Sequence, residues 1–341
     1  MTIKKRILIV SLGGTIAMTT DAAPGLVPTL ALDDLLRRSP ALASLGAIET
    51  WPLAGLPSAS LAIAQIIELA HGLRRRFADG CDGAVVVQGT DTLEETAFLL
   101  DCLLPGDQPV VVTGAMRGSN APGADGPANL VDAVRVATDE QSRGMGTLVV
   151  FDGEIHAARF VRKTHTLSLA AFRSVGRAAL GRVVADEVHV SAGVGRVAAI
   201  ERVDPAREWP VALFRFAMGA DDRVLKRLPD LGYGGLVIEG AGGGHVSACL
   251  MPAVRALAAK MPVVLASRCP EGPVLRATYA YPGSEMDLLS AGVLHAGDLC
   301  GLKARLLLSL LLMAQEDGAD LAARFRARAW SGSQPHMETI S

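Results

Sequence analysis

The stretch RILIVSLGGT, residues 6–15, joins a run of branched apolar residues to a Gly-Gly-Thr turn, which is typical of a buried strand that ends at a sheet edge. Three later stretches have the same form: GAVVVQG (83–89), QPVVVTG (108–114) and GTLVVFDG (146–153). Segments with apolar residues near every third or fourth position lie at 61–78, 93–104 and 127–140. This alternation of strands and helices predicts a parallel sheet that is covered by helices on both faces.

The alternation weakens after about residue 155 and restarts beyond a polar segment, ERVDPAREWP, at residues 201–210. Such a segment is typical of a linker between domains. We therefore expect an α/β fold with a larger N-terminal domain over residues 1–200, built on a mostly parallel sheet covered by helices. A smaller C-terminal α/β domain is expected over residues 211–341.

The overall charge gives no reason to expect a nucleic acid or an anionic membrane surface as partner. The chain of 341 residues carries 33 Lys and Arg against 35 Asp and Glu, a net charge of −2, and half of its residues are hydrophobic. Its longest apolar run, 306–314, is much shorter than the roughly 20 residues that a membrane-spanning helix needs. We expect a folded protein that binds neither nucleic acid nor membrane.

The five cysteines favour a reducing, cytoplasmic compartment. They form no CxxC pair and their number is odd, which argues against a disulfide framework and against a zinc cluster, so we expect buried, reduced thiols. Lys4, Lys5 and Arg6 before ILIVSLGG also resemble the start of a secretory signal peptide. We favour a first strand instead, because the turn after it carries candidate chemistry that cleavage would remove.

The turn after the first strand is the first candidate site. Gly13 and Gly14 permit close backbone approach, and Thr15 supplies a hydroxyl at the carboxyl edge of the sheet, where open parallel sheets bind ligands. The same sequence also serves as a plain turn in many proteins, so this motif alone leaves both interpretations open.

The turn after the second strand is the next candidate. Gly89, Thr90 and Asp91 place a hydroxyl and a carboxylate beside a helix N-terminus, where the partial positive charge of the helix favours an anionic ligand. Thr92 and Glu95 fit a capping box. The alternative is that Asp91 and Thr92 only cap this helix.

Two further groups are ambiguous by themselves. Lys163, between apolar and hydroxyl residues, could pair with a buried carboxylate such as Asp91, although on its own we favour a solvated lysine. His245, which follows the glycine-rich run 240–244, could face a ligand, but we favour a helix cap. The sequence contains no GxxxxGK[ST], HExxH or GxSxG motif, and the run at 240–244 lacks the spacing of a dinucleotide fingerprint.

Taken together, the motifs resemble those of bacterial-type L-asparaginases. The resemblance is carried by VSLGGTIA (10–17), QGTDTLEETAFLLD (88–101), TGAMRGSNAPGADGPANLVDAV (113–134), RKT (162–164) and VLASRCPEG (264–272), which match in order and approximate spacing. It implies a large and a small α/β domain and hydrolysis of L-asparagine to aspartate and ammonia. It implies no metal and no organic cofactor, and a homo-oligomer that is a dimer or a dimer of dimers.

The resemblance also implies roles for individual residues. Thr15 corresponds to the primary nucleophile. Thr90, Asp91 and Lys163 correspond to the second threonine with its Asp–Lys pair. The expected substrate-binding residues are Gly14, Ser58, Gly89 and Ala115. Ser58 would bind the α-carboxylate of the substrate, and the carbonyl of Ala115 its side-chain amide. Asp91 would bind the α-ammonium.

The sequence departs from the family pattern in the residues that activate the nucleophile. The segment after the first motif carries no tyrosine, and Leu26 stands at the equivalent place. The glutamate that many members contribute from a neighbouring subunit falls near Tyr279. We expect Tyr279 or Tyr281 to replace the missing tyrosine across a subunit interface, with His245 nearby. Ala59 stands where many members have a glutamine beside the serine, which bears on substrate selectivity.

Several functions remain compatible with these residues. The leading hypothesis is an L-asparaginase that uses a threonine nucleophile and an acyl-enzyme. A broader glutaminase-asparaginase or an amidase on a related small amide is the nearest alternative. A non-catalytic amino-acid-binding or assembly subunit belongs to another class, and an ammonia-supplying amidotransferase subunit lies between these. Retention of both candidate threonines with the Asp–Lys pair favours catalysis.

Overall fold

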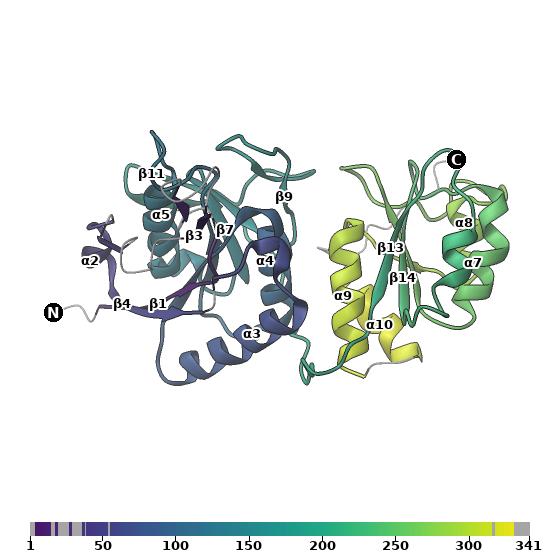
Figure 1. Ribbon diagram of the computed structural model, residues 1–341, viewed down its shortest axis with the longest axis horizontal. Helices are drawn as coiled ribbons and strands as arrows, with labels where there is room; N and C mark the ends of the chain where they lie inside the picture. Colours follow the sequence, from purple (N-terminus) through teal and green to yellow (C-terminus); the bar gives the residue numbers. More distant parts are fainter. Residues whose placement is uncertain are drawn as a thin grey trace. The chain divides into compact units, whose positions relative to one another are not determined.

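The computed structural model describes residues 4–14, 18–19, 27–28, 36–37, 39–53, 55–315 and 318–330. The chain divides into two compact units, Met1–Ala199 and Ile200–Ser341 (Figure 1). The expected two-domain α/β architecture is thereby confirmed. Segment 201–210 contains no helix or strand. Its role as a linker and the domain limits drawn from the sequence stay predictions.

The N-terminal unit contains most of the strands. Its strands are β1 (Arg6–Ser11), β2 (Met18–Thr19), β3 (Val27–Pro28), β4 (Ala47–Pro52), β5 (Gly83–Val87), β6 (Val110–Thr113), β7 (Thr147–Phe151), β8 (Glu154–Ala157), β9 (Val161–Lys163), β10 (Phe172–Ser174), β11 (Gly181–Val184) and β12 (Glu187–Val190). Its helices are α2 (Leu42–Leu45), α3 (Ile63–Ala78), α4 (Leu93–Leu103) and α5 (Gly126–Thr138), with short 3₁₀ turns η2 (Ser58–Ser60), η3 (Thr90–Thr92) and η4 (Glu140–Ser142).

The main sheet of this unit has the order β12-β11-β8-β7-β6-β5-β1-β4. The five strands from β4 to β7 pair in parallel, and the remaining three add antiparallel pairs at one side. Strands β5, β6 and β7 are buried along their whole length, which explains their continuous β-branched sequences. Because β1, β5 and β6 are neighbours and parallel, their carboxyl ends meet at one edge.

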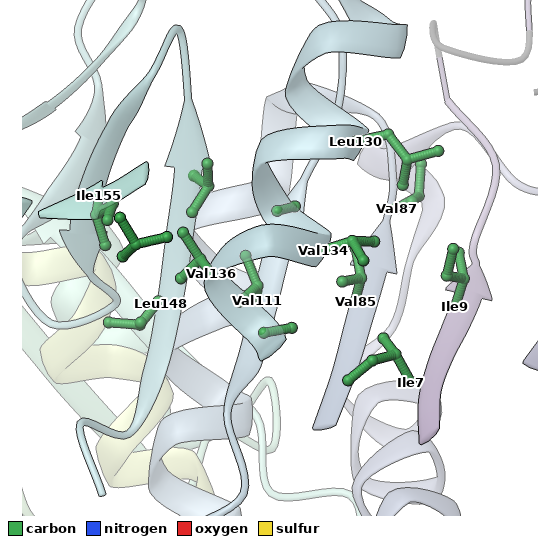
Figure 2. Packing of buried hydrophobic residues seen from close by; sticks show 14 of the residues in the cluster. Ile7, Ile9, Val85, Val87, Val111, Leu130, Val134, Val136, Leu148 and Ile155 are labelled. Carbon is green, nitrogen blue, oxygen red and sulfur yellow. The ribbon is translucent and has the colours of Figure 1, made fainter. Parts of the chain in front are cut away.

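Apolar side chains from alternate strand positions form the core on each face of the sheet. Ile7 and Ile9 of β1 belong to the buried cluster that packs against Leu130 and Val134 of α5 (Figure 2). Leu8, between them, is also fully buried and points to the opposite face, because successive side chains of a strand alternate. Figure 1 shows α5 on one side of the sheet and α3 with α4 on the other. Burying each such side chain contributes about 1.5–3 kcal/mol.

The C-terminal unit is a second, smaller parallel sheet between helices. Its elements are β13 (Val211–Arg215), α6 (Arg223–Arg227), β14 (Gly235–Gly240), η5 (Ala248–Leu250), α7 (Met251–Ala258), β15 (Val263–Ser267), α8 (Glu285–Ser290), β16 (Leu294–His295), α9 (Gly301–Met313) and α10 (Gly318–Ala329). The strands pair in parallel in the order β13-β14-β15-β16. Residues of α6, α7 and α8 join the buried cluster on one face, while α9 and α10 lie on the other side of the sheet (Figure 1).

The cysteines differ in exposure, and the expectation of buried thiols was wrong for some of them. All five are free, but only Cys81 and Cys102 are buried, whereas Cys249 and Cys269 are exposed. The exposed pair lies in η5 and in the loop after β15. In the described ranges, no helix has both the length and the apolar character needed to cross a membrane.

Candidate active site

Three turns meet at the carboxyl edge of the N-terminal sheet through direct backbone contacts. Leu12 N–H donates to the Val87 carbonyl at 2.9 Å, and Gln88 N–H donates to the Thr113 carbonyl at 3.1 Å. A Cβ at Gly14 would lie 2.1 Å from the Gly89 nitrogen, and the φ of Gly14 is +104°. Only glycine fits both constraints at Gly14. The turns after β1 and β5 therefore pack directly against each other.

Ser58 lies beside the second turn. It is buried, and its Oγ accepts a hydrogen bond from the Asp91 backbone N–H at 3.3 Å. A Cβ at Gly89 would lie 2.8 Å from this Oγ. The Thr92 hydroxyl donates to the Ser58 carbonyl at 2.8 Å and makes no capping bond, so the predicted capping box was wrong. Thr92 instead ties η2 to η3 and brings Ser58 to the sheet edge.

Lys163 joins Thr90 and Asp91 in one polar cluster. Its Nζ lies 2.9 Å from the Thr90 hydroxyl and 2.7 Å from Asp91 Oδ1. The lysine side chain is 15% exposed while the Asp91 side chain is 69% exposed. The preference for a solvated lysine was therefore wrong, because β9 carries Lys163 across to the turn after β5. The arrangement offers an amine next to a hydroxyl and a carboxylate that faces solvent.

Glu94 contacts the backbone of this lysine and was not predicted from the sequence. It is buried at the start of α4, and its Oε1 accepts a hydrogen bond from the Lys163 backbone N–H at 3.1 Å. Its Oε2 is buried without a hydrogen-bond partner among the described residues. Glu94 therefore fixes the backbone from which the Lys163 side chain extends.

The loop after β6 is held by a carboxylate and an amide that the sequence reasoning also missed. Asp125 accepts hydrogen bonds from the backbone N–H groups of Met116 and Arg117, each at 2.9 Å. Asn129 Nδ2 donates to the Gly114 carbonyl at 3.0 Å. Ala115, the predicted binder of the side-chain amide, is buried between these anchors. The sequence signal for them was a glycine-rich loop with more Gly, Ser and Asn than a plain connection needs.

Two residues that matter for the catalytic hypothesis are not placed. Thr15 and Leu26 lie outside the described residues. The last described residue of the first motif is Gly14. Gly14 packs against Gly89, which immediately precedes Thr90 in the chain.

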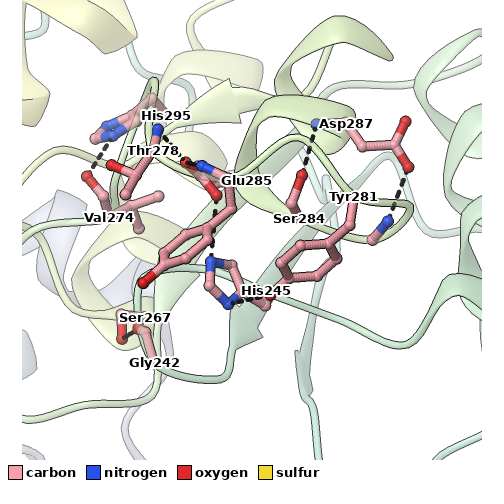
Figure 3. A network of polar contacts seen from close by, with 12 residues as sticks. Gly242, His245, Ser267, Val274, Thr278, Tyr281, Ser284, Glu285, Asp287 and His295 are labelled. Atoms are coloured by element: carbon pink, nitrogen blue, oxygen red, sulfur yellow. Dashed lines mark hydrogen bonds and ion pairs between the residues drawn. The ribbon is translucent and has the colours of Figure 1, made fainter. Parts of the chain in front are cut away.

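The structure brings His245 and Tyr281 together in the C-terminal unit (Figure 3), and Tyr279 packs against the same imidazole. The Tyr281 hydroxyl lies 2.9 Å from His245 Nδ1, and the Tyr279 ring meets the imidazole edge-on at 4.9 Å between centroids. His245 does not cap the next helical turn, because Ser247 is the N-cap of η5, so that expectation was wrong. Whether the two tyrosines act at a subunit interface stays a prediction.

Glu285 completes this second cluster and was missed by the sequence reasoning. It is fully buried, and its Oε2 lies 3.2 Å from His245 Nε2. Burial raises the pKa of Glu285. Hydrogen bonds from the backbone N–H groups of Tyr279 and Thr278, together with the nearby His245, lower this pKa by more, so that it lies below its ordinary value. Glu285 is therefore a buried carboxylate at neutral pH. No group of three His, Cys, Asp or Glu that could hold a metal is found in the described part of the chain.

Family models match both units of the chain. Residues 6–194 match the model described as asparaginase, N-terminal, and residues 210–325 match the glutaminase/asparaginase C-terminal domain. The chain belongs to the asparaginase family. It is 34% identical to an L-asparaginase of Bacillus licheniformis over 318 residues, which cover 92% of this chain and 97% of that protein.

Other similar proteins include a solved structure and a subunit of an amidotransferase. The crystal structure of a probable cytoplasmic L-asparaginase from Campylobacter jejuni superimposes with a TM-score of 0.85 at 31% identity, covering 95% of this chain and 99% of that one. A glutamyl-tRNA(Gln) amidotransferase subunit from Methanosarcina mazei is 32% identical over 305 residues, which cover 86% of this chain and 70% of that protein. This asparaginase-family chain is an amidohydrolase.

Proposed function

We propose that the protein is an L-asparaginase that hydrolyses L-asparagine to L-aspartate and ammonia through an acyl-enzyme on Thr15. The observation that carries the proposal is the contact of Lys163 Nζ with the Thr90 hydroxyl at 2.9 Å and with Asp91 Oδ1 at 2.7 Å. A threonine hydroxyl is a poor nucleophile unless a base accepts its proton. An amine in contact with a second hydroxyl is suited to move a proton at this sheet edge.

The remaining groups at this edge suit a small zwitterion. The exposed carboxylate of Asp91 would bind the α-ammonium of the substrate, and the Ser58 hydroxyl would bind its α-carboxylate. The carbonyl of Ala115 would accept a hydrogen bond from the side-chain amide nitrogen. Backbone N–H groups at the turn of Gly14 and Gly89 would stabilise the oxyanion, where loss of one donor typically costs about 10²–10³ in rate.

The chemical sequence follows from these roles. The Thr15 hydroxyl would attack the amide carbon and lose its proton to a base, and the C–N bond would then break as the leaving nitrogen takes up a proton and departs as ammonia. Water would next attack the resulting ester, its proton passing through Thr90 to Lys163, and release aspartate. Neither step calls for a metal or an organic cofactor.

We also propose a cytoplasmic homo-oligomer, either a dimer or a dimer of dimers. The five free thiols and the description of the Campylobacter jejuni protein as a probable cytoplasmic enzyme support the compartment. The family resemblance supports the oligomer. The mass of the assembly in solution tests it, since a monomer at micromolar concentration would contradict this part of the proposal.

The alternatives predict different products. A glutaminase-asparaginase would release ammonia from asparagine and glutamine at comparable rates. An amidotransferase-type subunit, for which the similarity to the Methanosarcina mazei protein speaks, would pass ammonia on to a partner. A binding subunit would release none.

Ammonia release from asparagine and from glutamine, measured side by side, tests the proposal. We expect turnover of asparagine by the wild-type protein and loss of about 10⁴-fold or more in Thr15→Ala, since removal of a nucleophile typically has effects of this size. Thr19→Ala is a control in the same N-terminal segment and is expected to keep the wild-type rate. Full activity of Thr15→Ala, or no turnover of asparagine by the wild type, would contradict the proposal.

A further inference from the structure

A cavity of about 560 Å³ lies within the N-terminal unit, apart from the sheet edge described above. Residues of the turn between β7 and β8, of β8, of β10 with the loop that follows it, and of β11 line this cavity. Its volume falls in the range of roughly 300–1,000 Å³ that is usual for small-molecule sites. The described residues that line it do not include those of the polar cluster around Lys163, so the cavity is separate from the candidate active site.

The charged side chains of the lining favour an anion. Three arginines and two carboxylates line the cavity: Arg173, Arg177, Arg182, Asp152 and Glu154. Guanidinium groups bind carboxylate and phosphate through paired hydrogen bonds. Phe172, Val183 and Val184 add apolar surface, and Val184 is 52% exposed. The lining is therefore suited to a small organic anion that has an apolar body.

The lining also includes a buried imidazole with an unsatisfied nitrogen. His156 is 1% exposed, and its Nδ1 lies 3.0 Å from the Ser174 hydroxyl. Its Nε2 is buried without a hydrogen-bond partner among the described residues, since Glu154 Oε2 lies 3.6 Å away. Burial lowers the pKa of His156 to about 4 against the opposing charge of Glu154, so the ring is neutral at pH 7. A bare Nε2 would face the carboxylate as a second acceptor, so the proton is favoured on Nε2.

Arg182 holds Glu154 away from this buried donor. The two residues stand opposite each other on β11 and β8, and Arg182 Nη2 donates to Glu154 Oε1 at 2.6 Å. The Arg182 side chain is 67% exposed. Arg177 is exposed as well, with its guanidinium 4.2 Å from the centroid of the Phe160 ring. An anion in the cavity can therefore compete with Glu154 for Arg182.

Strand β10 connects the cavity to the candidate active site. Phe172 and Ser174 of β10 line the cavity, and β10 pairs with β9 so that Phe172 stands opposite Lys163. The Phe172 ring packs on Phe151 at 4.7 Å between centroids, and the bond between Ser174 and His156 ties β10 to β8. The position of Lys163 therefore depends on how firmly β10 is held at the cavity.

We propose that this cavity is an effector site for a small organic anion and that binding there raises the rate of amide hydrolysis; this rests on the proposed function. The anionic group, a carboxylate or a phosphate, binds Arg177 and Arg182 and displaces Glu154 from Arg182. The apolar body of the ligand lies against the valines of β11.

The bound state differs from the empty state in the hydrogen bonds of His156. Once released, Glu154 needs to approach by only about 0.6 Å to accept the bond from His156 Nε2. Because hydrogen bonds in a chain polarise one another, the bond that Ser174 donates to Nδ1 becomes stronger. β10 is then held more firmly, and with it Lys163 on the neighbouring strand.

Calorimetric titration of the protein without substrate tests the site. Benzoate and phenyl phosphate carry the two anionic groups on the same ring, and benzyl alcohol is the neutral control. We expect at least one of the anions to bind with a Kd below about 1 mM, and more weakly at about 0.5 M salt. Arg177→Gln should weaken this binding by about tenfold or more. Arg143→Gln, at an exposed arginine outside the cavity, is the matched control and should keep the wild-type affinity.

Ammonia release from asparagine tests the coupling. We expect the saturating anion to raise the wild-type kcat about fivefold, at the lower end of typical allosteric effects. Ser174→Ala should bind the anion with an affinity within about threefold of wild type but should show no rise in kcat, because it lacks the hydroxyl that passes the change to β10. A variant that only weakened the fold would not separate binding from activation in this way.

Four results would overturn the inference: no saturable binding of either anion, unchanged affinity in Arg177→Gln, a wild-type kcat that does not rise at saturation, or the same rise in Ser174→Ala. The calorimetric result does not depend on catalysis. Failure of the proposed function would leave Thr15→Ala active or the wild type without turnover, whereas failure of this inference alone would leave Thr15→Ala inactive.

Discussion

The two sheet edges place their charges in opposite ways. At the N-terminal edge the lysine is shielded and its carboxylate partner Asp91 is 69% exposed. At the C-terminal edge the carboxylate of Glu285 is fully buried, and the neutral hydroxyl of Tyr281 is exposed instead. An exposed carboxylate can bind a cationic group of a ligand directly, while a buried one acts only through the group it contacts. The first edge is therefore suited to contact a charged group directly, whereas at the second edge the carboxylate acts through His245.

The backbone at the two edges differs as well. The turns of the N-terminal edge touch each other through Gly14 and Gly89, so that a Cβ at Gly14 would collide with main-chain atoms of Gly89. At the C-terminal edge the glycine turn touches side chains, such as Val274 and Leu275, and carries a histidine of its own. A substitution at Gly14 therefore meets main chain, whereas one at Gly243 or Gly244 meets side chains.

Among the residues that the structure places, the largest effect should come from Lys163→Met, which tests the N-terminal edge. Methionine keeps the apolar stem but removes the contacts with Thr90 and Asp91, so we expect kcat to fall about 10²–10⁴-fold. Lys163→Arg keeps the charge but is not expected to restore the rate, since a guanidinium does not accept a proton at neutral pH. Steady-state ammonia release is the measurement, and a kcat of Lys163→Met within threefold of wild type would exclude a role in proton transfer.

A smaller effect is expected from Gly14→Ala, which tests the main-chain contact. The new Cβ would lie 2.1 Å from the Gly89 nitrogen at a φ of +104°, and overpacking with backbone strain should cost about 3 kcal/mol in the free energy of unfolding. Gly193→Ala is the matched control, because nothing lies within 4 Å of its Cβ, and it should change stability by less than about 0.5 kcal/mol. Urea unfolding measures both, and equal stabilities would mean that the turns can separate freely.

A still smaller effect is expected when the pH falls from 7 to 5. Each of two histidines should then lower the free energy of unfolding by about 2 kcal/mol. Burial lowers the pKa of His156 to about 4, with Glu154 opposing it, and burial together with the charge of Arg276 lowers the pKa of His295 to about 4. Between about pH 6.5 and pH 4 the unfolded chain binds protons that the folded chain does not. Stability therefore falls as the pH drops through this window.

Because His156 lies in the N-terminal unit and His295 in the C-terminal unit, this pH effect can be assigned to each unit in turn. His156→Gln should flatten the pH dependence of the N-terminal unit, and His295→Gln that of the C-terminal unit. Urea unfolding at pH 7 and pH 5 is the measurement. An unchanged slope in both variants would show that these histidines take up protons equally in the folded and the unfolded protein.

Much of the fold could be predicted because buried strands carry an unmistakable pattern. The continuous Val and Ile runs of β1, β5, β6 and β7 are enough to indicate a parallel sheet. Strand β4 (Ala47–Pro52) was not predicted, since it is a partly exposed edge strand with polar residues between apolar ones. Edge strands depend on the neighbour that they pair with, here β1, and that neighbour is not written in their own sequence.

The candidate site could be predicted where the backbone conformation itself requires one residue type, as at Gly14. Groups that bond to main chain outside their own helical turn were missed, namely Glu94, Asp125, Asn129 and Glu285. Each accepts from or donates to main chain that tertiary structure brings near. The contact of Lys163 with Thr90 spans 73 residues, and Thr92 fitted a local motif but formed a long-range bond. Tertiary contacts override local patterns at such positions.

The most direct test of the central claim is to stop the reaction with asparagine by rapid acid quenching and to locate the acyl group by peptide mass spectrometry. The account predicts an aspartyl ester on the peptide that contains Thr15, present in Lys163→Met at a higher level than in the wild type, because hydrolysis of the ester slows. An ester on Thr90 or on a tyrosine, or turnover of asparagine with no acyl-enzyme in either protein, would contradict it.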